Sequence, residues 1–351
     1  MMHLLAALFV ALALLVAPVG TMGETGAELN DSQQPGSVLV FHKFQTGTVT
    51  IPDEAILPTT EFEISVNCPV GERCPGGQTV NLIAHWVCPG GAGRRCLERD
   101  FRLRTTVNGT LFFNPQNIGP TNVPSLPTPP CSAGYLIVWA VDNQERPIKF
   151  DGLTGNAVFR PAASSVGAYN ALPIQAVSAL ANGALISLGQ DDALVFDGRD
   201  GHYRALTGTI FGTVRYPKTV PPANHIDTFL TLLTLDVKSN RFNFPTIVDL
   251  NFFKPNEEVV SDSAEFTCWA EFNLFNIDLN LNEVFMGRKG LVESVNAVKV
   301  PIFGVDDKAG PVTLLGVIDT EEFSGSVSRR LYMYSLYNDG EPVATTFDPN
   351  P

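Results

Sequence analysis

Short segments with the patterning of β-strands follow one another along most of the chain, and they restrict its fold more than any other feature. Apolar and polar residues alternate strictly over residues 61–67, as in a strand with one buried face. Residues 135–141 form an apolar run that predicts a buried strand, and residues 228–237 are the most β-like run of the chain. Turn-forming residues separate these segments, and Asn108-Gly109 is a hairpin signal. The pattern predicts a mainly β protein.

One stretch interrupts this pattern and divides the chain. Residues 165–182 are rich in Ala, Leu and Ser and have the best helical composition of the chain, although Pro173 interrupts it. A chain of 351 residues is long enough for two domains. We therefore predict two tandem antiparallel β-sandwich domains, of jelly-roll or immunoglobulin-like type, at residues 37–160 and 190–351, with a partly helical connector at residues 161–189.

Two pairs of similar segments raise the question of an internal duplication. Residues 134–148 can be laid over residues 330–343, and residues 46–52 over residues 211–217. Both pairs keep their order in the two halves. A duplicated sandwich and the chance recurrence of strand–turn–strand patterns account equally well for the similarity.

The amino terminus predicts export. Residues 4–17 are an unbroken apolar run, shorter than the ~20 residues that span a bilayer as a helix. With the small and polar residues that follow, the run is typical of a secretory signal peptide at residues 1–23, with a second possible cleavage point after Ala27. The alternative is an uncleaved membrane anchor. Residues 24–36 are polar and turn-rich and predict a disordered lead-in. We expect a secreted or periplasmic protein with no transmembrane anchor after cleavage.

The cysteines support an oxidising compartment. An even count of six behind a signal peptide predicts disulfides. Short loops separate Cys68 from Cys74 and Cys88 from Cys96, so we predict that each pair is bonded, which leaves Cys131 for Cys268. Two alternatives are that Cys268 is a buried free thiol within a strand, and that four thiolates hold zinc. The absence of a C-x₂-C pair argues against zinc.

The sequence lacks the common catalytic motifs. It contains no G-x-S-x-G nucleophile elbow, no H-E-x-x-H pair and no phosphate-binding glycine loop of the P-loop or dinucleotide type. Its 36 acidic and 23 basic residues give a formal net charge of −13, which excludes nucleic acid as the main partner.

Carboxylates are the remaining candidates for chemistry. Glu61 and Glu63 project from one face of a predicted strand about 7 Å apart, within the 6.5–9.5 Å of inverting glycosidases. A solvated strand face is the alternative. Asp197 and Asp200 lie among turn glycines and could bind calcium, whereas structural Asp-Gly turns are the alternative. No other cofactor is predicted.

These observations favour a secreted, non-enzymatic structural, adhesive or ligand-binding β protein of the cell surface or extracellular space. Its expected partners are glycans, other cell-surface components or further copies of itself. The alternatives are a carbohydrate-active hydrolase with paired carboxylates and a calcium-stabilised surface module. The deciding observation is whether the fold gathers the candidate side chains into one cleft: Glu61, Glu63, His85, Asp197, Asp200 and His202.

Overall fold

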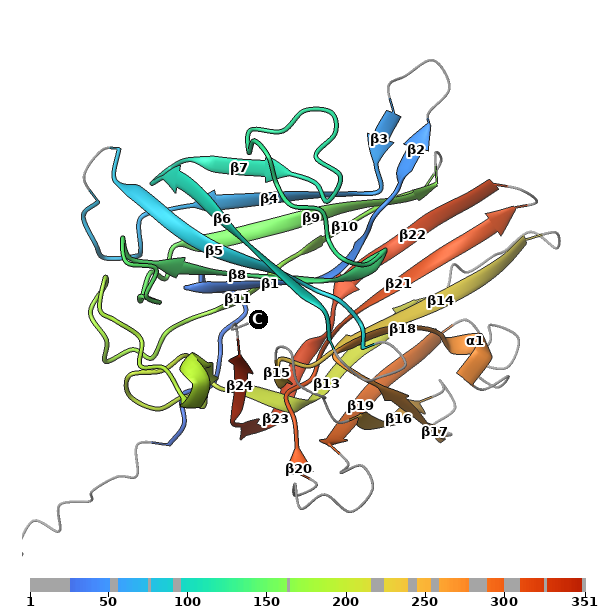
Figure 1. The fold of residues 1–351 in the computed structure, drawn as a ribbon. Helices are drawn as coiled ribbons and strands as arrows, with labels where there is room; N and C mark the ends of the chain where they lie inside the picture. The colour runs from blue at the N-terminus through green and yellow to red at the C-terminus, as the bar shows by residue number, and fades with distance from the viewer. Residues whose placement is uncertain are drawn as a thin grey trace, which may run out of the picture.

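The fold consists almost entirely of antiparallel β-sheet (Figure 1). The computed structural model describes residues 26–50, 56–74, 77–90, 96–162, 165–215, 224–238, 245–253, 259–277, 289–299, 310–324 and 327–348. Within these ranges, helical structure is limited to α1 (Leu274–Ile277) and one 3₁₀ turn, η1 (Gln190–Asp192). No helix in the described part of the chain is long and apolar enough to cross a membrane. The predicted signal peptide lies outside the described residues.

Two sheets from the N-terminal half pack face to face. The first has the order β11-β1-β8-β5-β6 and the second the order β10-β9-β4-β7. The first sheet is formed by β11 (Leu172–Ile174), β1 (Val38–Gln45), β8 (Ala133–Val141), β5 (Thr79–Val87) and β6 (Glu98–Thr106). The second is formed by β10 (Ser165–Asn170), β9 (Leu153–Ala162), β4 (Thr60–Val66) and β7 (Thr110–Phe113). Side chains from both sheets, such as Trp86 and Phe62, form a common core, here called core 1.

The turn at Asn108 has a different role from the one that its sequence predicts. Asn108 adopts the left-handed conformation that an Asn-Gly turn favours, with φ of 65°. However, β6 pairs with β5 whereas β7 pairs with β4, so the turn carries the chain from one sheet to the other. The predicted hairpin is wrong because each strand finds its partner elsewhere.

The C-terminal half contributes two further large sheets, which share a core of their own, core 3. One has the order β18-β14-β21-β22 and the other the order β17-β16-β19-β13-β23, with β20 on β19. The first comprises β18 (Trp269–Asn273), β14 (Asn224–Leu233), β21 (Leu315–Ser324) and β22 (Val327–Ser335). The second comprises β17 (Val259–Phe266), β16 (Thr246–Phe253), β19 (Lys289–Lys299), β13 (Leu206–Arg215), β23 (Tyr337–Val343) and β20 (Gly310–Pro311). Small sheets join β12 (Leu194–Phe196), β24 (Thr345–Asp348) and β15 (Val237–Lys238), and β2 (Thr48–Thr50) with β3 (Ile56–Pro58).

A third core joins the two halves. Strand β8 is buried on both faces: Leu136 and Val138 belong to core 1, whereas Ile137 and Trp139 belong to a separate cluster, core 2. Core 2 also contains residues from the C-terminal half, among them Leu194, Phe196, Leu233, Trp269 and Phe347. Because the halves share this core, their division into two tandem sandwich domains stays a prediction.

The matched segments of the suggested duplication take different places in the fold. Strand β8 is central in its sheet, whereas β22 is an edge strand that pairs with β21. The similarity between residues 134–148 and 330–343 therefore does not correspond to equivalent positions in the sheets.

The predicted helical connector is wrong. Within residues 161–189 the described chain forms the end of β9, then β10 and β11, followed by turns. Strand β10 pairs with β9 and β11 pairs with β1, so tertiary pairing overrides the helical preference of Ala and Leu. Pro173 fits because β11 is an edge strand.

Residues 26–36, predicted as part of a disordered lead-in, are instead held against the rest of the chain. The Glu28 amide donates to the Gly198 carbonyl at 2.9 Å, and the Ala205 amide donates to the Glu28 carbonyl at 2.8 Å. Gly198 has φ of 70°, and a Cβ there would lie 2.5 Å from the Glu28 backbone. Glycine therefore permits this close approach, and paired backbone groups fix a segment whose composition alone suggests disorder.

All six cysteines are paired, but only one predicted pairing is correct. Cys68–Cys74 is confirmed, whereas the predicted Cys88–Cys96 and Cys131–Cys268 bonds are wrong. The observed bonds are Cys88–Cys131 and Cys96–Cys268. Cys88 follows β5 and Cys131 precedes β8, and these strands are antiparallel neighbours, so sheet pairing rather than loop length brings the two sulfurs together.

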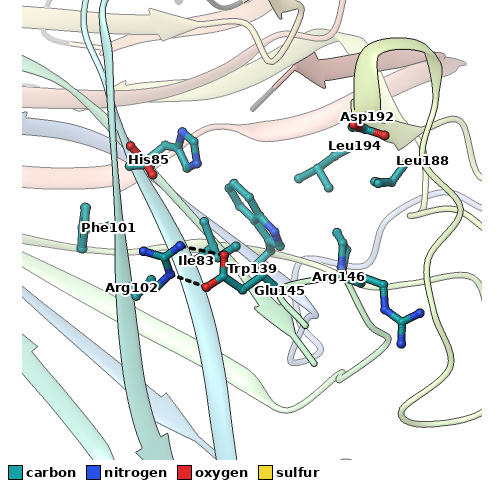
Figure 2. A pocket seen from close by; sticks show the side chains of 12 residues that line it. Ile83, His85, Phe101, Arg102, Trp139, Glu145, Arg146, Leu188, Asp192 and Leu194 are labelled. Carbon is teal, nitrogen blue, oxygen red and sulfur yellow. Dashed lines mark hydrogen bonds and ion pairs between the residues drawn. The ribbon is translucent and has the colours of Figure 1, made fainter. Parts of the chain in front are cut away.

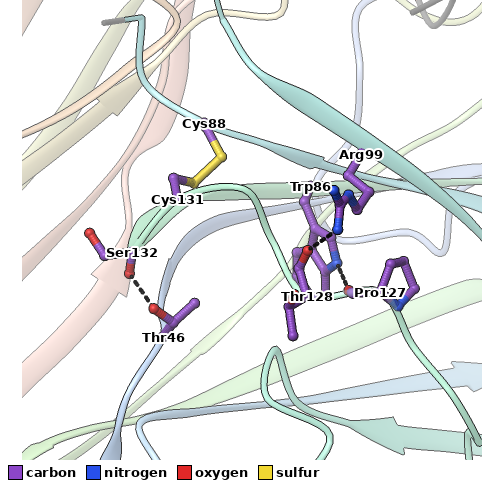
Figure 3. The surroundings of a disulfide bond; sticks show 8 residues. All are labelled: Thr46, Trp86, Cys88, Arg99, Pro127, Thr128, Cys131 and Ser132. Atoms are coloured by element: carbon purple, nitrogen blue, oxygen red, sulfur yellow. Dashed lines mark hydrogen bonds between the residues drawn. A yellow bond between two sulfur atoms is a disulfide. The ribbon is translucent and has the colours of Figure 1, made fainter.

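The Cys88–Cys131 bond also fixes the end of a long proline-rich loop (Figure 3). The Trp86 indole N–H donates to the Pro127 carbonyl at 2.9 Å, and the Arg99 guanidinium donates to the Thr128 carbonyl at 3.3 Å. The loop is thereby held beside β5.

Cys96–Cys268 links the two halves over 172 residues of sequence. Cys268 lies in the turn between β17 and β18, with φ of 65°, rather than inside the strand that its neighbours predict. Both cysteines belong to core 2, so the covalent link and the shared core tie the same two parts together.

Candidate functional site

The outer face of β5 and β6, turned away from core 1, carries two adjoining hollows lined by polar groups. Ile83 lies opposite Arg102 and His85 lies opposite Asp100 in the antiparallel register. Directly opposed residues share a face of a sheet, and so do residues two apart in one strand. On the other side of β5, Ile83 lies opposite Trp139 of β8.

A cavity of about 510 Å³ opens over this face (Figure 2). Its apolar lining includes Ile83 and Trp139 from the sheet, and Leu188 and Leu194 from the chain around η1. Figure 2 shows Leu188, Asp192 and Leu194 across the cavity from Arg102. The polar lining consists of His85, Asp100, Arg102, Glu145, Arg146 and Asp192.

A second cavity, of about 360 Å³, adjoins the first. Ile83, Arg102 and Glu145 line both cavities, and the second adds Asn81 and Asn143, among others. The Asn81 amide donates to Asn143 at 3.0 Å. The two hollows together are called the outer groove below.

An ion pair stands where the two cavities meet. Arg102 Nε donates to Glu145 Oε1 at 2.5 Å and Nη2 donates to Oε2 at 2.8 Å, so the pair is bidentate. Glu145 lies in the turn after β8, with φ of 65°, and its carboxylate accepts both hydrogen bonds of the guanidinium. The hydrogen bonds from Arg102 lower the pKa of the Glu145 carboxyl, and those to Glu145 raise the pKa of Arg102. Both side chains are largely exposed and therefore accessible to a ligand.

His85 is a buried residue of the groove lining. Its ring is 4.9 Å from the Trp139 ring in a stacked arrangement and 5.8 Å from the ring of Phe347. His85 Nδ1 lies 3.3 Å from Glu98 Oε2, whose side chain is 4% exposed. Among the described residues, Glu98 Oε1 has no hydrogen-bond partner. The charge of Glu98 also acts on the buried Tyr135. Burial first, and then Glu98 and Asp236, raise the pKa of Tyr135 well above its ordinary value.

The make-up of the groove suits a small ligand. The described residues that line its two cavities include no Ser, Thr or Cys, so His85 and Glu98 have no hydroxyl or thiol to activate there. The lining instead combines an apolar floor with a few converging polar groups, which is the usual make-up of a small-ligand site.

The fold does not gather the side chains singled out in the sequence into one cleft. His85 lines the groove, but Glu61 and Glu63 lie on β4, in the other sheet. Glu61 is in contact with Arg160, and Glu63 accepts a hydrogen bond from Asn156 at 3.3 Å. Neither Glu61 nor Glu63 lines any of the cavities described for this structure. A glycosidase pair at these positions stays a prediction.

The candidate calcium ligands lie in a turn. Asp197 Oδ1 accepts from the Arg199 amide at 3.0 Å and lies 2.9 Å from His202 Nδ1, while Asp200 is exposed. The described residues contain no group of three or more His, Cys, Asp or Glu arranged to hold a metal. Asp197 therefore caps its turn, and calcium binding here stays a prediction.

Sequence reasoning missed most of the groove. The alternation of β6 places Arg102 on the outer face, but Glu145 and Asp192 come from turns distant in sequence. No known protein family matches the chain, and no curated protein is significantly similar to it in sequence.

Proposed function

We propose that this protein is a secreted, non-enzymatic binding protein that takes a neutral oligosaccharide in the outer groove. The observation that carries the proposal is the pair of adjoining cavities that share Ile83, Arg102 and Glu145. Adjoining hollows along one sheet face suit an elongated ligand whose successive units occupy each in turn. Three disulfides and an all-β fold suit the extracellular space.

The charges of the rim favour a neutral ligand. Arg102 is paired with Glu145, and Arg146 Nη2 lies 2.7 Å from Asp142 Oδ2, so each of these two cations already has an anion beside it. A strongly charged ligand would have to displace one of these partners, whereas hydroxyl groups can add hydrogen bonds to both members of a pair. Asp100 and Asp192 add further acceptors for hydroxyl donors.

The floor favours a ligand with apolar faces as well. Ile83, Leu188 and Leu194 offer hydrocarbon surface, and Trp139 lies beneath with 2% of its surface exposed. The C–H faces of a sugar ring can cover such a floor while its hydroxyls reach the rim. Apolar contact then contributes affinity, and the polar groups set orientation.

The test is calorimetric titration of the full chain with a panel of neutral and charged oligosaccharides. Arg102→Ala should weaken binding of a neutral oligosaccharide about tenfold or more, since each tenfold corresponds to about 1.4 kcal/mol. Arg160→Ala is the matched control, because it removes an Arg–Glu pair from the other sheet and should leave the affinity unchanged.

Three results would contradict the proposal. One is the absence of binding across the panel, and another is equal weakening by Arg102→Ala and Arg160→Ala. The third is turnover of a glycoside that Glu61→Gln or Glu63→Gln abolishes, which would establish the hydrolase instead.

A further inference from the structure

Lys43 lies in the interior where the two halves meet, at an irregular place in β1. The register between β1 and β8 shifts between Phe41 and Phe44, so the pairing of the two strands is irregular at Lys43. The lysine side chain is 1% exposed. Strand β1 also contacts β14 and β21 of the C-terminal half at this level.

Two carboxylates from the C-terminal half meet the Lys43 ammonium. Its Nζ lies 2.9 Å from Asp319 Oδ2 of β21, and it is also in contact with Glu271 Oε2 of β18. The Asp319 side chain is fully buried, and that of Glu271 is 22% exposed. The centre of the Phe159 ring is 4.6 Å from Nζ, so an aromatic wall excludes water on one side.

The contact places an amine and a carboxyl group together, away from water. Burial penalises an ammonium and a carboxylate, and a proton passed from one to the other removes both charges. A neutral amine beside a carboxylic acid, held in contact and away from water, has the two reactants of an amide bond. Fixed proximity of this kind replaces a bimolecular encounter.

We propose that Lys43 Nζ and Asp319 Cγ become joined by an intramolecular isopeptide bond. This bond would link the two halves covalently, in addition to the Cys96–Cys268 disulfide, whether or not the outer groove binds a ligand. The bond would close a ring between residues 276 positions apart.

The reaction balances without a further reagent. The Lys43 ammonium passes a proton to the Asp319 carboxylate, and the resulting amine attacks Cγ of the acid. Glu271 accepts the proton on nitrogen of the tetrahedral adduct and gives it to the leaving oxygen as the C–O bond breaks, so Glu271 ends as the carboxylate with which it began. One C–N bond forms, one C–O bond breaks and one water leaves, with no change of oxidation state.

Burial and hydrogen bonding distinguish the roles of the two carboxylates. Asp319 is sealed from solvent, so the amide formed there is protected from hydrolysis. Glu271 is partly exposed and its Oε2 accepts from Thr231 Oγ1 at 3.4 Å, which suits a group that passes protons and lets water depart. Glu271 is thus the acid–base group and Asp319 the electrophile.

The test is mass spectrometry of the secreted full chain after reduction and alkylation. The intact mass should be lower by one water molecule than its sequence requires. Digestion should yield a branched peptide that joins the segment with Lys43 to the segment with Asp319. Lys43→Arg retains a cation but cannot form this bond, so its mass should agree with its sequence.

A second variant separates chemistry from folding. Glu271→Gln keeps the shape of the side chain but removes the proton acceptor, so a folded variant should retain the unmodified mass or lose water far more slowly. A wild-type mass equal to the sequence mass would overturn the proposal. A branch at Glu271 instead of Asp319 would overturn the assignment of the electrophile, and unimpaired water loss in Glu271→Gln would overturn its role.

Discussion

The two faces of the β11-β1-β8-β5-β6 sheet are covered in different ways. The inner face packs against a second sheet from the same half, through core 1. The outer face is covered over β1 and β8 by residues of core 2, many of them from the C-terminal half, and is hollowed over β5 and β6. The same sheet therefore serves as one wall of a sandwich, as the joint between halves, and as the floor of the outer groove.

This difference shows how a covering layer that ends partway across a sheet creates a site. Strand β8 has both faces buried, whereas β6 alternates between buried Phe101 and Leu103 and exposed Arg102 and Arg104. The charged residues on the edge strand β6 also discourage pairing with another chain. The groove lies where the sheet passes from β8, which is buried on both faces, to β6, whose buried and exposed residues alternate.

The largest expected effect on stability comes from removing the Cys96–Cys268 disulfide, which links the two halves. In the chain-entropy relation, a disulfide closing 172 residues stabilises by about 5 kcal/mol and one closing 6 residues by about 2 kcal/mol. Cys96→Ser with Cys268→Ser should therefore lower the free energy of unfolding more than Cys68→Ser with Cys74→Ser does. Urea unfolding of the two double variants makes the comparison, and equal losses would show that the halves are not coupled through this bond.

The next effect compares the two faces directly through two tryptophans. Trp86 belongs to core 1 and Trp139 to core 2, and each is at most 2% exposed. Replacing a buried tryptophan with alanine costs about 3–5 kcal/mol. Trp86→Ala and Trp139→Ala should thus destabilise to a similar extent in urea unfolding. A much smaller loss for Trp139→Ala would mean that the C-terminal half covers the outer face only weakly.

The sequence predicted strands well because their signals are local. The alternation of residues 61–67 and the apolar run of residues 135–141 correspond to β4 and β8 within two residues. The same local signals say nothing of which strands pair, so the Asn108 turn and the partners of Cys88 were predicted wrongly. The run in β8 contained an unused clue, since a strand buried on both faces requires a third layer.

The groove could not be predicted because its side chains come from separate parts of the chain. Arg102, Glu145 and Asp192 belong to a strand, a turn and a 3₁₀ turn, and only tertiary packing brings them together. Lys43 and Asp319 are further apart in sequence still, and the register shift of β1 at Lys43 has no pattern in the sequence that predicts it. Motif searches find sites whose residues are close in sequence, which neither of these is.

The smallest expected effect concerns pH and His42 of β1, where the N-terminal half meets the C-terminal half. Its side chain is buried, and its backbone carbonyl accepts from the Trp269 indole N–H at 2.8 Å. Burial lowers the pKa of His42 from 6.5 to about 3. The folded protein therefore keeps this ring neutral under conditions in which the unfolded chain binds a proton.

The sign of the effect follows from proton binding. Stability from neutral His42 is fully present above about pH 6.5 and is lost as the pH falls towards 3, because the unfolded state then binds more protons. Between pH 7 and pH 5 the loss should be about 2 kcal/mol. The measurement is the difference in this pH slope between the wild type and His42→Asn in urea unfolding, which removes the contributions that the two proteins share. If the two slopes agree, His42 is hydrated in the folded protein and the joint between the halves is open to water.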